Sequence, residues 1–122
     1  MDIILLLTLF FVHFLADFPL QGDYLAKYKD PHRMGKSRND PPWWYCMLAH
    51  SAIHGGFVSL IISTIAPAMW WLGLCEVVAH FWIDTGKCYG YFGYMTDQYL
   101  HLVCKVIWML LVAASFGGVM LN

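Results

Sequence analysis

Histidine and aspartate side chains recur at a spacing of four residues in four places along an otherwise apolar chain. Residues four apart lie on one face of an α-helix, about 6 Å from each other along its axis. Each pair is therefore predicted to form a polar column on one helix face. Because ionisable side chains are costly in apolar surroundings, four such columns indicate a built site. The columns are His13 with Asp17, His50 with His54, His80 with Asp84, and Asp97 with His101.

Imidazole and carboxylate groups together are ligands for zinc, manganese or iron, and facing helices can present them to one ion. We therefore predict a divalent metal site, with zinc favoured and manganese or iron as alternatives. Asp17 and Asp84 can either ligate the ion or accept the second ring proton of a ligating histidine. The competing interpretation is a metal-free proton relay or hydrogen-bonded network. The predicted metal ligands are His13, His50, His54, His80, Asp84 and His101.

Three side chains are predicted to act in catalysis if the site hydrolyses a substrate: Asp17, Asp97 and Lys87. Asp17 or Asp97 would serve as the general base on a water that the metal activates. Lys87 follows Asp84 by one helical turn, so its ammonium group can reach the mouth of the site and orient an anion. A positively charged anchor at a membrane surface is the simpler role for this lysine.

Four apolar stretches must position these columns. The 122-residue chain is 60% hydrophobic and only 12% charged, which leaves too little polar surface to cover a soluble bundle, the alternative architecture. A helix needs about 17 to 25 residues to cross a bilayer. We therefore predict one integral membrane domain over residues 1–122, an all-α up-down bundle of four transmembrane helices. Their predicted ranges are about 2–20, 43–65, 68–87 and 96–121, with a cytoplasmic loop over 22–42.

The basic residues determine the predicted orientation. Five of the seven Lys and Arg residues lie in the first loop, and Lys87 opens the third. Since cytoplasmic loops collect Lys and Arg, both termini are predicted outside, in a bacterial inner (plasma) membrane, with the polar columns near the cytoplasmic face. Residues 22–30 are predicted to form a short interfacial helix, and 31–42 a mobile strap over the site. The bilayer is thus the expected partner, and no pattern in the chain indicates nucleic-acid binding.

The two halves of the chain repeat the same pattern and are predicted to form two parallel-repeated helical hairpins, with the site at their interface. In antiparallel helices, two residues at the same depth have position numbers that add up to a constant. The constant sums pair Asp17 with His50, His13 with His54, Asp84 with Asp97, His80 with His101, and Glu76 with Lys105, the last as an ion pair.

Gly55 and Gly56 suit a close helix contact, inside one chain or in a homo-oligomer.

The residues around the columns complete a longer pattern: His13-Phe-Leu-Ala-Asp17-Phe-Pro-Leu-Gln21, His50, His80-x-x-x-Asp84-x-x-Lys87 and Asp97-Gln98-x-x-His101. On these residues the chain resembles a family of small bacterial and phage membrane proteins, domain-of-unknown-function family 3307. The resemblance covers nearly the whole chain and implies a membrane fold and these site positions, without supplying a reaction. A weaker similarity, carried by His50, Ser51 and His54, is to membrane-bound metal-dependent hydrolases.

Two classes of function fit these observations. The first is a metal-dependent hydrolase that acts on a lipid-linked or other membrane-accessible ester or phosphoester, with an anionic small molecule as the ligand. The second is a non-catalytic protein that binds or transports metal ions or protons, or that a phage or mobile element uses to alter the host envelope. Transport needs a polar path through the outer helix halves, which offer few polar residues. The sequence therefore favours a site that is closed toward the outside.

Overall fold

The computed structural model covers the chain and describes residues 2–33 and 35–119, in which all regular structure is helical. Four long helices carry the polar columns, one column on each helix. The elements are α1 (Asp2–Asp17), α2 (Gly22–Tyr28), α3 (Trp43–Ile65), the 3-10 turn η1 (Pro67–Met69), α4 (Leu72–Cys88) and α5 (Tyr94–Val119).

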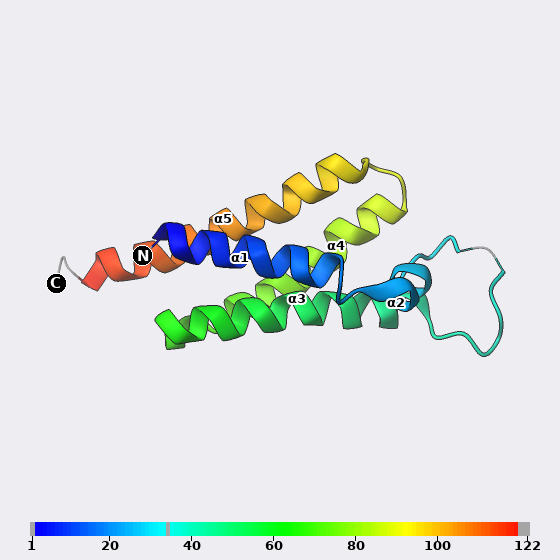
Figure 1. The fold of residues 1–122 in the computed structure, drawn as a ribbon, viewed down its shortest axis with the longest axis horizontal. Helices are drawn as coiled ribbons and strands as arrows, with labels where there is room; N and C mark the ends of the chain where they lie inside the picture. Colours follow the sequence, from blue (N-terminus) through cyan, green and yellow to red (C-terminus); the bar gives the residue numbers. More distant parts are fainter. Residues whose placement is uncertain (1, 34, 120–122) are drawn as a thin grey trace.

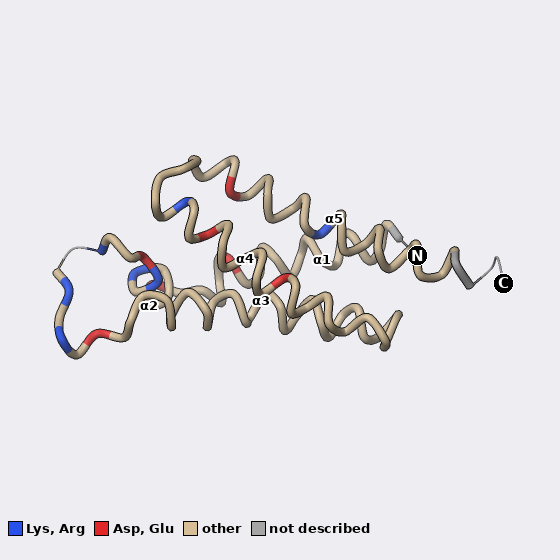
Figure 2. The backbone as a smooth tube through the Cα atoms, turned by 180° about the vertical axis from the view of Figure 1, so that it is seen from behind, with Lys and Arg blue, Asp and Glu red and all other residues tan. Residues whose placement is uncertain are grey.

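The four long helices run up and down along the long axis of the molecule (Figure 1). The first and last described residues lie at one end of the bundle, and α2 and the α4–α5 turn lie at the other (Figure 1). The Lys and Arg positions gather toward the end with the long loop (Figure 2). The all-helical fold and the up-down order agree with the sequence prediction.

The helix ends differ from the prediction in two places. The first helix ends at Asp17, not at 20, and α2 leaves at 80° to α1. Pro19 cannot donate a backbone hydrogen bond, and Gly22 adopts a φ of 61°, a value that favours glycine. The third long helix begins at Leu72 and not at 68, because Pro67 opens the 3-10 turn. The predicted short helix after residue 22 is confirmed as α2.

Two helices are long and apolar enough to cross a membrane, α3 over Trp43–Ile65 and α5 over Tyr94–Gly117. A third span is reached if α1 and α2 are counted together as one broken segment. Helix α4 has only 17 residues, or about 25 Å of helix, somewhat less than the bilayer's hydrocarbon thickness.

The bundle interior has an apolar part and a polar part. The apolar core lies toward the termini and is built by Leu5, Leu9, Val58, Ile62 and Val112, all buried. The polar part lies next to it, toward α2. The helices thus enclose a region where His and Asp side chains take the place of core hydrophobic residues.

A close contact between α3 and α4 fixes how these two helices face each other. Gly55 lies against Gly73, and a Cβ at either glycine would collide with the carbonyl oxygen of the other. The Ser59 hydroxyl donates a hydrogen bond to the Trp70 carbonyl, 2.8 Å away, just before α4. The predicted close contact is confirmed for Gly55, whereas a Cβ on Gly56 would meet open space.

Candidate metal centre

The four columns converge inside the bundle. Helices α1, α3, α4 and α5 each contribute two side chains, as the spacing of four residues within each pair predicts. The predicted ligands are all buried, and Asp17 retains 10% exposure of its side chain. The structure therefore brings together every histidine and aspartate predicted for the site: His13, Asp17, His50, His54, His80, Asp84, Asp97 and His101.

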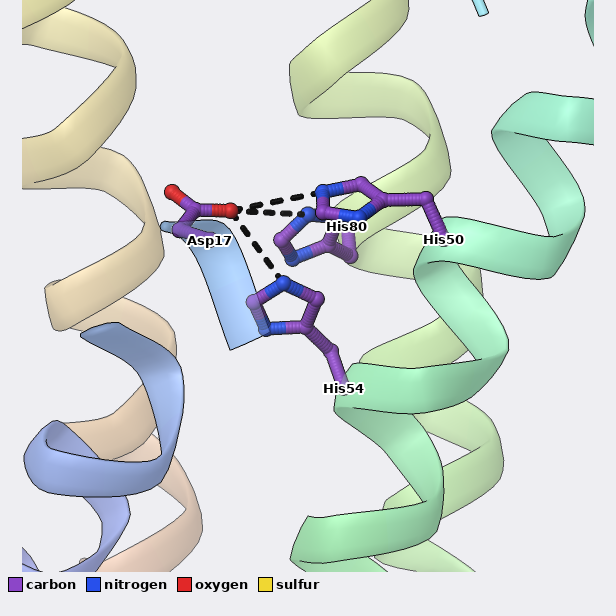
Figure 3. Close-up of side chains that lie close together, drawn as sticks. All are labelled: Asp17, His50, His54 and His80. Atoms are coloured by element: carbon purple, nitrogen blue, oxygen red, sulfur yellow. Dashed lines mark ion pairs between the residues drawn. The ribbon is translucent and has the colours of Figure 1, made fainter. Parts of the chain in front are cut away.

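Asp17 lies at the centre of the largest group. Its Oδ1 atom is 3.3 Å from His50 Nε2, 3.2 Å from His54 Nε2 and 3.9 Å from His80 Nε2. The four ligand atoms all lie within 4.8 Å of one another. Figure 3 shows the three imidazole rings directed at one oxygen of the carboxylate. We name Asp17, His50, His54 and His80 the four-residue group.

The ring nitrogens of this group are poorly satisfied. The three Nε2 atoms share one Asp17 oxygen at ion-pair distance, and the buried Nδ1 atoms of His50 and His54 have no hydrogen-bond partner among the described residues. Buried polar atoms in folded proteins are nearly always satisfied, since leaving one unpaired costs about 1 to 3 kcal/mol. The convergence of Nε2 nitrogens on a carboxylate is the donor set that a metal ion requires.

Gln98 holds Asp17 in this position. Its amide nitrogen donates to Asp17 Oδ2 at 2.8 Å and lies 3.2 Å from Asp97 Oδ2. The amide thus occupies the Oδ2 atom of Asp17 and leaves the Oδ1 atom for the three histidines. Gln98 belongs to the family-like pattern, but the spacing of His and Asp gave it no role.

A second group lies beside the first, formed by Asp84, Asp97 and His101. His101 Nε2 is 3.0 Å from Asp84 Oδ1 and 3.5 Å from Asp97 Oδ1. Two lysines neutralise these carboxylates. Lys87 donates to Asp97 Oδ2 at 3.0 Å, and Lys29 donates to Asp84.

Stacked rings connect the two groups. The His80 ring lies between His54 and His101, with centroid distances of 3.7 and 4.0 Å. His13, whose ring centroid is 5.2 Å from that of His54, forms a third ligand group with His80 and His101. The depth pairs His80 with His101 and His13 with His54 are thus in contact as predicted.

Lys29 lies at the site, although its sequence position did not predict this. It was counted among the basic residues of the loop, yet its side chain is only 8% exposed and pairs with Asp84. The 80° bend after α1 places Lys29, at the end of α2, beside Asp84 of α4. No spacing rule connects residues 29 and 84, so no sequence signal indicated this pair.

The loop after Lys29 does not cover the site. Residues 31–33 and 35–42 project beyond the end of the bundle (Figure 1), because α3 begins about two turns before His50. The prediction of a strap over the site is therefore wrong for this segment, and Lys29 provides the cover. Within the loop, the Ser37 amide donates to Asp40, and this bond together with the Arg33 guanidinium lowers the pKa of Asp40.

The predicted Glu76–Lys105 ion pair is confirmed, on the apolar side of the cluster. Lys105 Nζ is 2.5 Å from Glu76 Oε1, and Trp108 Nε1 donates to Glu76 Oε2 at 2.6 Å. Both charged side chains are fully buried. Glu76 Oε1 is also 3.6 Å from His80 Nδ1, so this pair lies directly behind a member of the four-residue group.

The fold and the site define a class: a helical protein with candidate membrane spans and a buried His/Asp cluster that four of its helices build. Comparison with known families assigns the chain more narrowly. It belongs to the family described as protein of unknown function, DUF3307, whose profile matches residues 5–120. The match covers all four columns, and the predicted membership is confirmed. Neither the curated proteins nor the solved structures include a match to this chain.

Proposed function

We propose that this protein spans the membrane four times and holds a divalent metal ion, with zinc preferred over manganese or iron, in the four-residue group. The carrying observation is the convergence of three imidazole Nε2 atoms on one oxygen of Asp17, at 3.2 to 3.9 Å. Zinc bonds of about 2.0 to 2.1 Å place the ligands of a tetrahedral site about 3.3 Å apart. Separations of 3.2 and 3.3 Å from Asp17 to His54 and His50 match that spacing, and the separation of 3.9 Å from Asp17 to His80 is longer.

The metal explains the cluster better than a proton relay does. A hydrogen-bonded network would satisfy its buried members, whereas three Nε2 atoms share one Asp17 oxygen and the buried Nδ1 atoms of His50 and His54 have no hydrogen-bond partner among the described residues. A metal ion bound to Nε2 of each ring would satisfy one side. The ion would also offset the Asp17 charge, which the described lysines do not contact.

The surface of α4 supports four spans, although this helix is short. Leu74, Val78 and Trp82 are 57, 60 and 67% exposed. On the opposite face, every fourth residue is buried and polar, from Glu76 through His80 to Asp84. A helix with an apolar outside and a polar inside suits a protein surrounded by lipid. With the basic loop in the cytoplasm, the termini would be outside and the cluster near the cytoplasmic leaflet.

The reaction that we propose is metal-dependent hydrolysis of an ester or phosphoester at the membrane surface. Asp17 fits the role of ligand better than that of base, since it contacts three of the proposed ligands. Asp97 fits the general base, because among the described residues only His101, 3.5 Å away, lies beside its buried Oδ1 atom. Lys87 would hold Asp97 and meet an anionic substrate.

Transport fits the geometry less well. The apolar core of Leu5, Leu9, Val58 and Ile62 lies between the cluster and the end with the termini. An ion that entered from the side of α2 would meet a closed interior. A non-catalytic binding protein remains the second candidate, and it is distinguished by whether the bound metal supports turnover.

The test of the hydrolase assignment uses detergent-purified, zinc-loaded protein and a chromogenic phosphodiester. We expect turnover that a chelator abolishes and added zinc restores. Asp97→Asn should lower the rate about 100-fold or more while the metal content is unchanged. Turnover that is absent in metal-loaded wild-type protein, or equal in Asp97→Asn, would remove the hydrolase and leave the binding protein.

A further inference from the structure

A polar pocket of about 300 Å³ opens beside the cluster. Its walls come from the end of α1, from α2, from the end of α4 and from the start of α5. One of its walls is Asp17, the proposed metal ligand, so the pocket is the entrance to the four-residue group. The polar lining includes Asp17, Gln21, Lys29, Asp30, Lys87 and Gln98.

The two lysines of this pocket come from separate elements and are both held in place by carboxylates. Lys29 is buried beside Asp84, and Lys87 is 3.0 Å from Asp97 and 3.9 Å from Asp84. Lysine binds phosphate as a point charge, so two lysines beside a metal can meet separate oxygens of one phosphate. The buried Oε1 atom of Gln21 has no hydrogen-bond partner among the described residues and can accept a proton from a bound ligand.

The charge balance indicates what the pocket attracts. The walls carry Asp17, Asp30, Lys29 and Lys87, and Asp84 and Asp97 pair with the two lysines. Four carboxylates and two ammonium groups leave two net negative charges, which a divalent ion in the four-residue group would offset. The ion and the two lysines would then attract an anion locally, in a region screened from water.

We infer that the pocket binds a phosphate group between Lys29, Lys87 and the metal, which makes a phosphate ester the substrate class of the site. This inference rests on the proposed metal centre. Phe18 and Tyr94 also line the pocket and are both about half exposed, so the opening lies where a lipid headgroup or a soluble phosphate ester can enter.

The test is calorimetric titration of zinc-loaded protein in detergent with inorganic phosphate, and with acetate as the carboxylate control. Lys29→Met should weaken phosphate binding about tenfold or more, since hydrogen bonds to charged groups contribute on that order. Its metal content should stay constant, because Lys29 pairs with Asp84 and with no member of the four-residue group. Lys27→Met should bind phosphate like wild type, as it removes an exposed lysine of α2 that does not line the pocket.

Several outcomes would overturn the inference. These are metal-loaded protein that binds no phosphate, acetate that binds as tightly as phosphate, or Lys29→Met that keeps wild-type phosphate affinity. Loss of metal together with phosphate in Lys29→Met would make the lysine structural. Wild-type protein without metal would instead overturn the proposed function, and this inference with it.

Nanodiscs distinguish the two sources of the phosphate group. The same titration is repeated in phosphatidylcholine discs with and without phosphatidic acid. Competition by phosphatidic acid supports a lipid headgroup as the ligand. Phosphate affinity that is equal in both discs supports a soluble phosphate ester.

Discussion

Replacing Lys105 by methionine should destabilise the bundle strongly, because it leaves the Glu76 carboxylate buried without its cation. The two side chains are fully buried and are joined at 2.5 Å. Breaking one side of a buried ion pair costs about 3 to 5 kcal/mol. Trp108 still donates to the other carboxylate oxygen in the variant, so we expect the lower half of that range.

The double variant Glu76→Gln with Lys105→Met provides the matched comparison. It removes both charges and keeps an acceptor for the Trp108 indole. Since replacing a buried pair by neutral groups is often close to neutral in energy, the double variant should recover most of the loss.

The assay is unfolding of the purified protein in mixed micelles with rising SDS, followed by circular dichroism. The free energy of unfolding is compared among wild type, each single variant and the double variant. A cost below about 1 kcal/mol for Lys105→Met, or a double variant as unstable as the worse single one, would refute the buried-pair argument.

Three further predictions concern packing, the cluster and the orientation. Gly55→Ala should destabilise by about 1 to 3 kcal/mol because its Cβ meets α4, whereas Gly56→Ala faces open space and should be neutral or slightly stabilising in the same unfolding assay. Gln98→Leu should weaken metal affinity about 10- to 100-fold in a competition titration, since Asp17 loses the amide that orients it, and unchanged affinity would contradict that role. A cysteine placed at Ser37 in a cysteine-free background should resist an impermeant thiol reagent in intact cells and react in inverted vesicles; the reverse pattern would overturn the orientation.

Much of the cluster was predictable because helix periodicity acts locally. A spacing of four residues put His13 above Asp17 and His80 above Asp84, and the constant sums of an antiparallel hairpin placed Glu76 opposite Lys105. These inferences need only the helix rise and the order of the helices. The contact within each pair follows from the rise per residue and from the order of the helices.

The rest depends on how the chain turns between helices. The 80° bend after α1 brings Lys29 to Asp84, and the 3-10 turn that begins at Pro67 moves the start of α4 to Leu72. Neither follows from periodicity, because a turn's direction depends on backbone angles such as that of Gly22. The sequence also left Asp17 between two roles, and only its distances to three imidazoles favour that of ligand.

The central claim, that the four-residue group binds a metal ion, is tested most directly by elemental analysis of the purified protein. Wild type is compared with His54→Ala and with the control Trp70→Ala, whose side chain is half exposed and directly follows η1. We predict about one zinc per chain in wild type and in Trp70→Ala, and a large loss in His54→Ala. Folded wild-type protein that takes up no metal after loading, or His54→Ala with full metal content, would contradict the account.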